Sequence, residues 1–196
     1  LNNRDKIEDC LSKISLSGSH LLDLINKVLD MSKIESGNVG LSEDAFCLEE
    51  LVEEVSLIVK PDMDSKGQEL SISLKEIDHH AVYGDAVRVK QILINLLSNA
   101  DKFTKRGKIT LDFSVNEEKQ MAIFSVTDTG CGIPKEKQGL VFERFEKLNE
   151  YAQGTGLGLS ICKLIVHKWK GSIWIDPDYT GGARFVFSHP LNIEKE

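Results

Sequence analysis

Three polar residues, Asn95, Asn99 and Lys102, stand four and three positions apart in a largely apolar segment. In a helix they fall, together with Gln91, within an arc of roughly 80°, and the apolar residues gather on the opposite side. A carboxamide oxygen can bind Mg²⁺ without adding charge beside a polyphosphate, and a lysine can balance a phosphate. The wet side of an ordinary amphipathic helix has the same pattern. Because asparagine is a mediocre helix former, we favour a functional role for these residues over an ordinary solvent-facing side, with Asn99 as the metal ligand.

A second candidate is the turn of residues 128–134, which begins with Asp128 at the end of a mostly apolar stretch. Gly130 and Gly132 allow the backbone to approach a flat ligand because glycine has no side chain. The carboxylate could accept a hydrogen bond from the exocyclic amine of adenine, which guanine lacks at that position. An ordinary turn before a proline-started helix fits equally well. Aspartic proteases share the Asp-Thr-Gly tripeptide but need two such carboxylates, and this chain has one copy.

A third candidate is the alternation of Gly154, Gly156 and Gly158 directly before a segment with helical periodicity from Leu159. Free backbone N–H groups and the positive end of the helix dipole would face one space, which suits phosphate oxygens. The run matches neither a Walker A loop nor the dinucleotide-binding pattern, and the chain lacks the signature segments of Ser/Thr/Tyr kinases. A flexible linker is the alternative. Taken together, the three candidates predict a site for Mg-ATP.

Two phenylalanines, Phe142 and Phe145, precede the glycine run, and a polar stretch over residues 146–153 separates them from it. This stretch is long enough to close over a nucleotide as a lid, with Lys147 reaching a phosphate. The two rings would clamp one end of the lid, although core packing explains them equally well.

Composition limits the class of protein. The chain has 196 residues, of which 41% are hydrophobic, so it is neither disordered nor fibrous. A net charge of -7 without a basic stripe argues against a nucleic-acid partner. Four scattered cysteines suggest neither zinc nor disulfides, so we expect a reducing, cytoplasmic setting. No apolar run approaches the roughly 20 residues of a bilayer span, and the first residues lack a signal-peptide pattern, so we expect a soluble domain.

Hydrophobic periodicity predicts the elements that position these residues. A long amphipathic helix over about residues 4–34 has no neighbouring helix in sequence to cover its apolar face, which favours a coiled-coil or bundle partner. We place a domain boundary near Gly37. A strand near residues 41–46 then precedes a helix from Leu48, which Pro61 ends or kinks. Its predicted buried side consists of Leu51, Val52, Val55, Ile58 and Val59.

The second half of the chain alternates strands and helices. After a strand over residues 69–74, Asp85 is predicted to cap the helix that carries the polar stripe. The later elements are a hairpin of strands 108–115 and 121–127, a helix from Leu159 that stops at Gly171, and strands 172–175 and 183–187.

Taken in order, these motifs resemble a known family. Residues 84–104, 128–132, 142–145 and 154–160 are similar to the asparagine, first glycine, phenylalanine and second glycine boxes of sensor histidine kinases of two-component systems. The resemblance covers most of residues 41–190, and it is specific because four separated motifs agree in kind and order. It implies an α+β fold, a two-layer α/β sandwich in which a mixed sheet carries three helices on one face, preceded by one long helix.

The resemblance also implies ATP and Mg²⁺ as cofactors. Asn99 would bind the metal, Lys102 and Lys147 would contact phosphate, and Asp128 would read adenine. The other nucleotide-binding residues implied are Asn95, Phe103, Gly130, Gly132, Ile133, Gly154, Thr155, Gly156, Leu157, Gly158 and Leu159. Asn95 and Lys102 are the implied catalytic pair.

Asn95 distinguishes this chain from the similar ATPases of the topoisomerase and mismatch-repair kind, which carry a glutamate there that activates water. An amide cannot take up a proton. We therefore expect poor ATP hydrolysis and transfer of the phosphoryl group to an imidazole nucleophile.

Residues 1–37 resemble the second helix of the family's dimerisation and phosphotransfer hairpin, and residues 38–196 resemble its catalytic ATP-binding domain. The segment with the phosphorylated histidine is not found in this sequence, and His20 is expected to be a packing residue. The implied partners are the protein's own hairpin, a response-regulator receiver domain and a second copy in a full-length homodimer, which could be anchored in the inner membrane. Two alternatives stay open: a dimeric nucleotide-binding switch without kinase activity, and an ATP-hydrolysing machine of the topoisomerase and chaperone kind.

Overall fold

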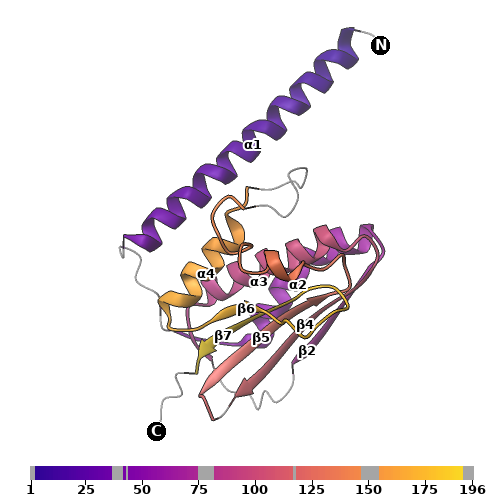
Figure 1. Cartoon of the computed structure of the whole chain (residues 1–196). Coiled ribbons are helices and arrows are strands. Elements are labelled where there is room, and N and C mark those ends of the chain that lie inside the picture. Colours follow the sequence, from indigo (N-terminus) through magenta and orange to yellow (C-terminus); the bar gives the residue numbers. More distant parts are fainter. Residues whose placement is uncertain are drawn as a thin grey trace. The chain divides into compact units, whose positions relative to one another are not determined.

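Figure 1 shows the computed structural model of the chain, which describes residues 3–36, 42, 44–74, 82–116, 118–146 and 155–191. The chain divides into two compact units, Leu1–Val39 and Gly40–Glu196. Within the described ranges, no helix has both the length and the apolar character needed to cross a membrane.

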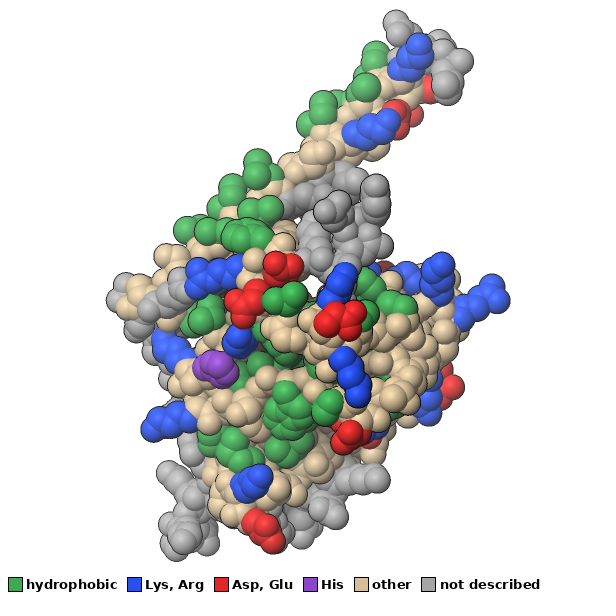
Figure 2. Space-filling view, in the orientation of Figure 1, with side chains coloured by type: hydrophobic (Ala, Val, Ile, Leu, Met, Phe, Trp, Pro, Cys, Tyr) green, Lys and Arg blue, Asp and Glu red, His purple; other side chains and the backbone are tan. Residues whose placement is uncertain are grey.

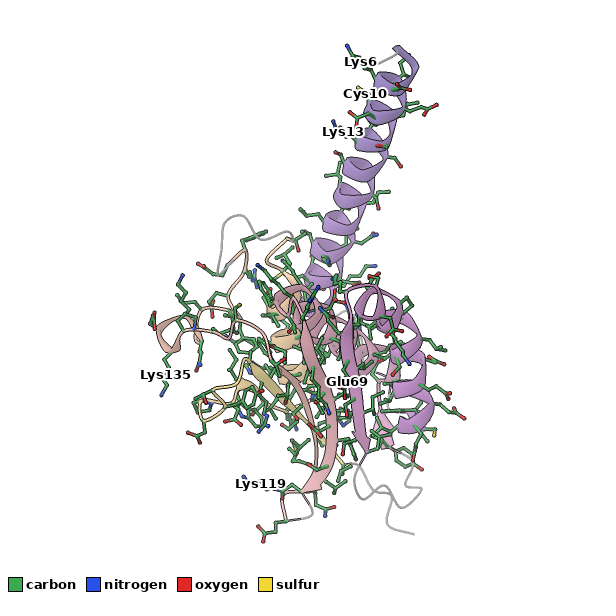
Figure 3. The ribbon with its side chains drawn as sticks, turned by 90° about the vertical axis from the view of Figure 1, so that its right-hand side faces the viewer. Lys6, Cys10, Lys13, Glu69, Lys119 and Lys135 are labelled. Atoms are coloured by element: carbon green, nitrogen blue, oxygen red, sulfur yellow. The ribbon has the colours of Figure 1, made fainter. Side chains whose placement is uncertain are left out.

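The first unit is one helix, α1 (Asn3–Glu35), as the periodicity predicts. Figure 2 shows hydrophobic side chains following this helix, and nine of the described ones are exposed by 37% to 68%: Ile7, Leu11, Ile14, Leu21, Leu22, Leu24, Ile25, Val28 and Leu29. Lys6, Cys10 and Lys13, labelled in Figure 3, are also exposed on this helix. The helix is therefore amphipathic along its length, and the side chain of His20 lies outside the described residues.

The second unit is built on a five-stranded mixed sheet with the strand order β2-β4-β5-β7-β6. The edge strand β2 (Gln68–Leu74) runs parallel to β4 (Gly107–Asn116). The other neighbours are antiparallel, through β5 (Met121–Asp128), β7 (Arg184–Pro190) and β6 (Ile173–Ile175). The predicted hairpin over residues 108–127 is thus confirmed as β4 and β5, with Lys119 at its turn (Figure 3).

Three helices lie on one face of this sheet (Figure 1): α2 (Leu48–Ser65), α3 (Ala86–Phe103) and α4 (Gly158–Lys168). A short antiparallel pair, β1 (Asp44–Phe46) and β3 (Val82–Gly84), forms a separate two-stranded sheet ahead of α3. The predicted two-layer sandwich with a mixed sheet is therefore confirmed.

The core lies between the helices and the sheet, because alternate strand residues point toward the helical layer. Three aromatic rings from adjacent strands form its centre: Phe124 stacks on Phe187 at 4.6 Å and meets Phe113 edge-on at 5.0 Å between centroids. From the helical side, α3 contributes Val89, Ile92, Leu93, Leu96, Leu97 and Ala100, all buried. This packing holds α3 firmly on the sheet.

Two expectations for α2 fail or need refinement. Pro61 does not end the helix, which continues to Ser65. An interior proline loses one backbone hydrogen bond, and burial of Val59 and Met63 on either side offsets that loss. Ile58 was predicted to be buried but is 53% exposed, because the buried stripe passes through Val55, Val59 and Met63 instead.

Other element ends shift by a few residues. β7 runs on to Pro190, three residues beyond the predicted end at Phe187, because it continues to pair with β5 as far as Met121. α4 begins at Gly158 and β6 at Ile173, one residue from their predicted starts. Of the predicted strand near residues 41–46, the structure has β1, and residues 41 and 43 lie outside the described residues.

Candidate functional site

The helix that carries the polar stripe has a fixed starting point. Asp85 caps α3 as predicted, since its Oδ1 accepts a hydrogen bond from the Arg88 backbone N–H at 3.0 Å. Just before it, a Cβ on Gly84 would lie 2.5 Å from Nε2 of His189, so only glycine leaves room for that imidazole. These contacts fix where the stripe begins relative to the sheet.

The stripe itself has the predicted two-sided character. Asn95 and Asn99 are half-buried and Lys102 is exposed, opposite the fully buried apolar side of α3. The Asn95 amide nitrogen donates to Sγ of Cys162 on α4 at 3.0 Å. The Asn99 side chain has no hydrogen-bond partner within the described residues, and Lys102 Nζ lies 5.0 Å from the centroid of the Phe103 ring.

The carboxylate of Asp101, next to the stripe, forms an ion pair with a lysine outside the stripe. Lys66, at the end of α2, pairs with it at 2.6 Å. The Gln68 amide nitrogen also donates to the Asp101 carbonyl oxygen at 2.9 Å, which fastens the last turn of α3 to β2. Asp101 is therefore engaged with α2 and β2.

Asp128 ends β5 and is nearly buried, with 4% of its surface exposed. Its Oδ1 accepts from the backbone N–H groups of Gly130 at 2.8 Å and Ala183 at 3.2 Å, and no described residue bonds its Oδ2. Burial raises the pKa of this carboxyl, and the two backbone donors act in the opposite direction. Oδ1 is thus held by two backbone groups, and Oδ2 has no hydrogen-bond partner among the described residues.

Glycines make the Asp128 turn possible. A Cβ on Gly130 would lie 2.5 Å from the Phe103 carbonyl oxygen, and one on Gly132 would lie 3.0 Å from the Gly182 carbonyl oxygen. Gly182 has a φ of +156°, and a Cβ added there would lie only 2.1 Å from the Asp128 carbonyl oxygen. The structure therefore brings the predicted residues Phe103, Gly130, Gly132 and Asp128 together, and Ile133 follows half-buried.

The loop between β6 and β7 supports this turn through residues that sequence reasoning missed. The Tyr179 hydroxyl donates to the Asp128 carbonyl oxygen at 3.1 Å. Arg184 lies over the Tyr179 ring at 4.8 Å and donates through Nε to Thr127 Oγ1 at 3.0 Å. The Gly181-Gly182 pair signals a close approach of two backbones, but nothing in the sequence says to which segment.

The second glycine run meets the stripe. Gly158, the first residue of α4, has no Cβ, and one there would lie 2.3 Å from Asn95 Oδ1. Gly156, at φ of +71°, accepts a hydrogen bond from the Phe145 N–H at 3.0 Å. The Leu157 N–H donates to Thr155 Oγ1 at 3.3 Å. Leu157 is fully buried and Leu159 half-buried, whereas Gly154 and Lys147 lie outside the described residues.

The two phenylalanines before the run behave differently. Phe142 is buried and meets Phe185 edge-on at 6.2 Å, so core packing describes it well. Phe145 is 63% exposed and adopts a φ of 62°, a left-handed conformation that is uncommon outside glycine. Core packing was therefore the wrong interpretation for Phe145.

The cysteines also divide into two kinds. Cys10, Cys47 and Cys131 are exposed, and Cys131 stands in the Asp128 turn between Gly130 and Gly132. Cys162 is buried, and burial is the main cause that raises the pKa of its thiol to about 12.

The chain is similar to known proteins in both sequence and structure. Residues 84–193 match the family described as histidine kinase-, DNA gyrase B- and HSP90-like ATPase. The autoinducer 2 sensor kinase/phosphatase LuxQ of Vibrio cholerae is 33% identical over 196 residues, covering 96% of this chain and 23% of LuxQ. The chain thus spans about a quarter of the length of this curated relative.

Two solved structures are similar over nearly the whole chain. Full-length ShkA in complex with AMPPNP has a TM-score of 0.83 and 30% identity, covering 94% of this chain and 38% of that one. The histidine kinase ThkA in complex with the response regulator TrrA has a TM-score of 0.78 and 27% identity, covering 100% of this chain and 55% of that one.

Proposed function

Because the chain belongs to the histidine kinase-, DNA gyrase B- and HSP90-like ATPase family, we propose that its second unit is the ATP-binding catalytic part of a sensor histidine kinase. In the whole protein it transfers the γ-phosphoryl group of ATP to a histidine on a dimerisation helix, from which a response-regulator aspartate receives it. Similarity to the sensor kinase/phosphatase LuxQ supports the kinase activity, and similarity to ShkA, solved with AMPPNP, supports the binding of nucleotide. Similarity to ThkA, solved with TrrA, supports the response regulator as partner. We place this activity in the cytoplasm, where ATP is available.

The observation that carries the proposal is the arrangement around Asp128. A nearly buried carboxylate has Oδ1 held by two backbone N–H groups and Oδ2 without a partner among the described residues. Such an oxygen can accept a hydrogen bond from the exocyclic amine of adenine. Guanine has a second acceptor at that position instead, which is unfavourable next to a carboxylate. Gly130 and Gly132 let the turn pack directly against the carbonyl oxygens of Phe103 and Gly182, which holds Asp128 in this position.

The phosphates are proposed to lie between the stripe of α3 and the run from Gly154 to Gly158. The contact between Asn95 and Gly158 supports this placement, because it joins the stripe to the first residue of α4. Backbone N–H groups at the start of α4 and the ammonium of Lys102 would balance the phosphate charge. Lys147 is assigned the same role from the lid.

The residues present fit a magnesium ion. Asn99 offers a half-buried carboxamide without a hydrogen-bond partner among the described residues, on the face shared with Asn95, and we propose it as the protein's metal ligand. When bound, the ion would neutralise charge on the triphosphate. Asn95 cannot take up a proton, so this chain's residues leave water unactivated and orient ATP for an imidazole whose lone pair is already available.

The test is the Mg²⁺-dependent ATP affinity of the chain, measured by calorimetry for the wild type, Asp128→Ala and Asn99→Ala. Wild type should prefer ATP to GTP, Asp128→Ala should lose that preference, and Asn99→Ala should lose the gain in affinity that magnesium gives. Ser98→Ala, exposed on the same helix, is the matched control and should behave as wild type.

A phosphotransfer assay separates the alternatives. Added to a hairpin that carries the acceptor histidine, the chain should label it with an acid-labile phosphoryl group. Binding without any transfer would favour the switch module, and steady phosphate release from the chain alone would favour the ATPase.

A further inference from the structure

A buried thiol on α4 contacts Asn95, a residue of the polar stripe on α3. Cys162 is 1% exposed on α4, and its Sγ accepts a hydrogen bond from the Asn95 amide nitrogen at 3.0 Å. The two residues are 67 positions apart in the chain, so neither motif predicts the contact. The function proposed above gives Cys162 no role.

The orientation of the Asn95 carboxamide matters because its two ends differ chemically. The oxygen can accept hydrogen bonds and bind cations, whereas the NH₂ group can only donate. With the nitrogen on sulfur, Oδ1 lies against Gly158, 2.3 Å from where a Cβ would stand. Rotating the group by half a turn would exchange the oxygen and the donor at the start of α4.

We propose that Cys162 is a positioning residue: its sulfur holds the amide nitrogen of Asn95 and so presents Asn95 Oδ1 at the start of α4, toward the magnesium triphosphate. The proposal rests on the function proposed above and adds a residue to it. Gly158 completes the arrangement, because any side chain there would displace the carboxamide.

A thiol suits this position because it stays neutral. Burial raises the pKa of Cys162 to about 12, while the hydrogen bond from Asn95 works in the opposite direction. A neutral sulfur accepts the N–H without placing a negative charge near the phosphates. The side chain is also small enough to be enclosed with Ile161, Ile165 and Val166 in the buried side of α4.

The test compares three substitutions of Cys162 in this chain by titration with ATP, with magnesium and with a chelator. Cys162→Val and Cys162→Ala remove the acceptor, and each should weaken Mg-ATP binding by about five- to tenfold, the usual effect of one lost hydrogen bond. Binding of ATP in chelator should change less than about twofold. Cys162→Ser keeps an acceptor, even if its hydroxyl donates within the helix, and should stay within about threefold of wild type.

A double-mutant cycle with Asn95→Ala identifies the route of the effect. Once Asn95 is absent, Cys162→Ala should have no further effect on Mg-ATP affinity. Ile165→Val is the matched control, since Ile165 is equally buried on α4 and its side chain has no atom that could hydrogen-bond the carboxamide. It should lower the thermal midpoint without changing the magnesium dependence. Using both Val and Ala guards against a failure of one variant to fold.

The outcomes separate the two proposals. If wild type binds Mg-ATP and the Val and Ala variants bind it equally well, or if their loss persists without Asn95, the positioning role is wrong and the proposed function stands. A Ser variant as weak as Val would also overturn it. A wild-type chain that binds no ATP would overturn the proposed function together with this inference.

Discussion

The two ends of the proposed nucleotide site are built in different ways. At the base end, the Asp128 turn is held by hydrogen bonds from Gly130, Ala183 and Tyr179 and by a bond from its own N–H to the Ala183 carbonyl oxygen at 2.8 Å. At the phosphate end, the stripe is linked to α4 by a hydrogen bond between two side chains, from Asn95 to Cys162.

This difference teaches that the base end is organised before any ligand arrives. Its geometry comes from backbone groups and bare glycines, which have no rotamers to lose. The phosphate end depends on long or unpartnered side chains, whose ordering on binding costs free energy. We therefore expect the base end to tolerate few substitutions without losing its geometry. At the phosphate end, smaller changes to single side chains should already alter phosphate binding. Three experiments test how tightly the base end and the framework of α3 are built.

The largest effect is expected from Gly182→Ala. The added Cβ would lie 2.1 Å from the Asp128 carbonyl oxygen, at a φ of +156° that other residues rarely adopt. We expect the free energy of unfolding to fall by about 3 kcal/mol in urea denaturation, with ATP affinity lost because Asp128 is displaced. Gly139→Ala is the control: nothing lies within 4 Å of its Cβ, so stability should change by less than about 0.5 kcal/mol. Equal behaviour of the two variants would mean that the base end is not tightly built.

A smaller effect is expected from Asp128→Asn, which should lower the ATP affinity and raise the stability of the fold. The amide oxygen can still accept from Gly130 and Ala183, but the NH₂ group cannot accept from adenine, so ATP affinity should fall by about ten- to a hundredfold. Stability should move the other way.

The sign follows from the raised pKa of Asp128, whose ordinary value is 3.8. The folded state holds the proton more tightly than the unfolded state, so the stability from this group is present below that value and is lost as the pH rises through the folded pKa. At pH 7, well above the ordinary value, the wild type has lost this stability, whereas the Asn variant, which does not titrate, keeps the stability of a neutral side chain. Urea midpoints should favour the variant at pH 7 and converge toward pH 4; a less stable variant at pH 7 would contradict the assignment.

The smallest effect concerns the framework that supports α3. His189 lies against Gly84 and meets Trp169 edge-on at 4.6 Å, and its burial lowers the pKa of the imidazole below 6.5, against the opposing charge of Asp85. In the interval below 6.5 the unfolded state binds a proton that the folded state excludes, so stability is full above this pH and declines as the pH falls. Between pH 7.5 and 5.5 the wild type should lose more stability than His189→Gln. Equal losses would show that His189 does not titrate in this way.

The sequence predicted those parts of the site that depend on local spacing. The Asp85 cap, the two-sided helix α3 and the β4–β5 hairpin each follow from the pattern of one continuous stretch of sequence. The partners of Asp128 could not be predicted in this way. Ala183 and Tyr179 lie 55 and 51 positions away, and a backbone N–H donor has no side-chain signature.

Two local rules were also outweighed by tertiary packing. The helix-breaking tendency of Pro61 was overcome because Val59 and Met63 are buried on either side of it. Phe145 was open to interpretation as a core residue, yet its backbone hydrogen bond to Gly156 accompanies an exposed ring in a left-handed conformation. In both cases the deciding factor is a tertiary one: the burial of Val59 and Met63 under other elements, and the hydrogen bond of Phe145 to a distant residue.

The exposed sulfur of Cys131 makes the base end accessible to spectroscopy. Because Cys162 is enclosed, a maleimide dye would react with Cys10, Cys47 and Cys131 alone. With serine at the first two positions, the fluorophore would sit in the turn that Asp128 opens. Its emission would then serve as an optical reporter of nucleotide arrival and departure in real time.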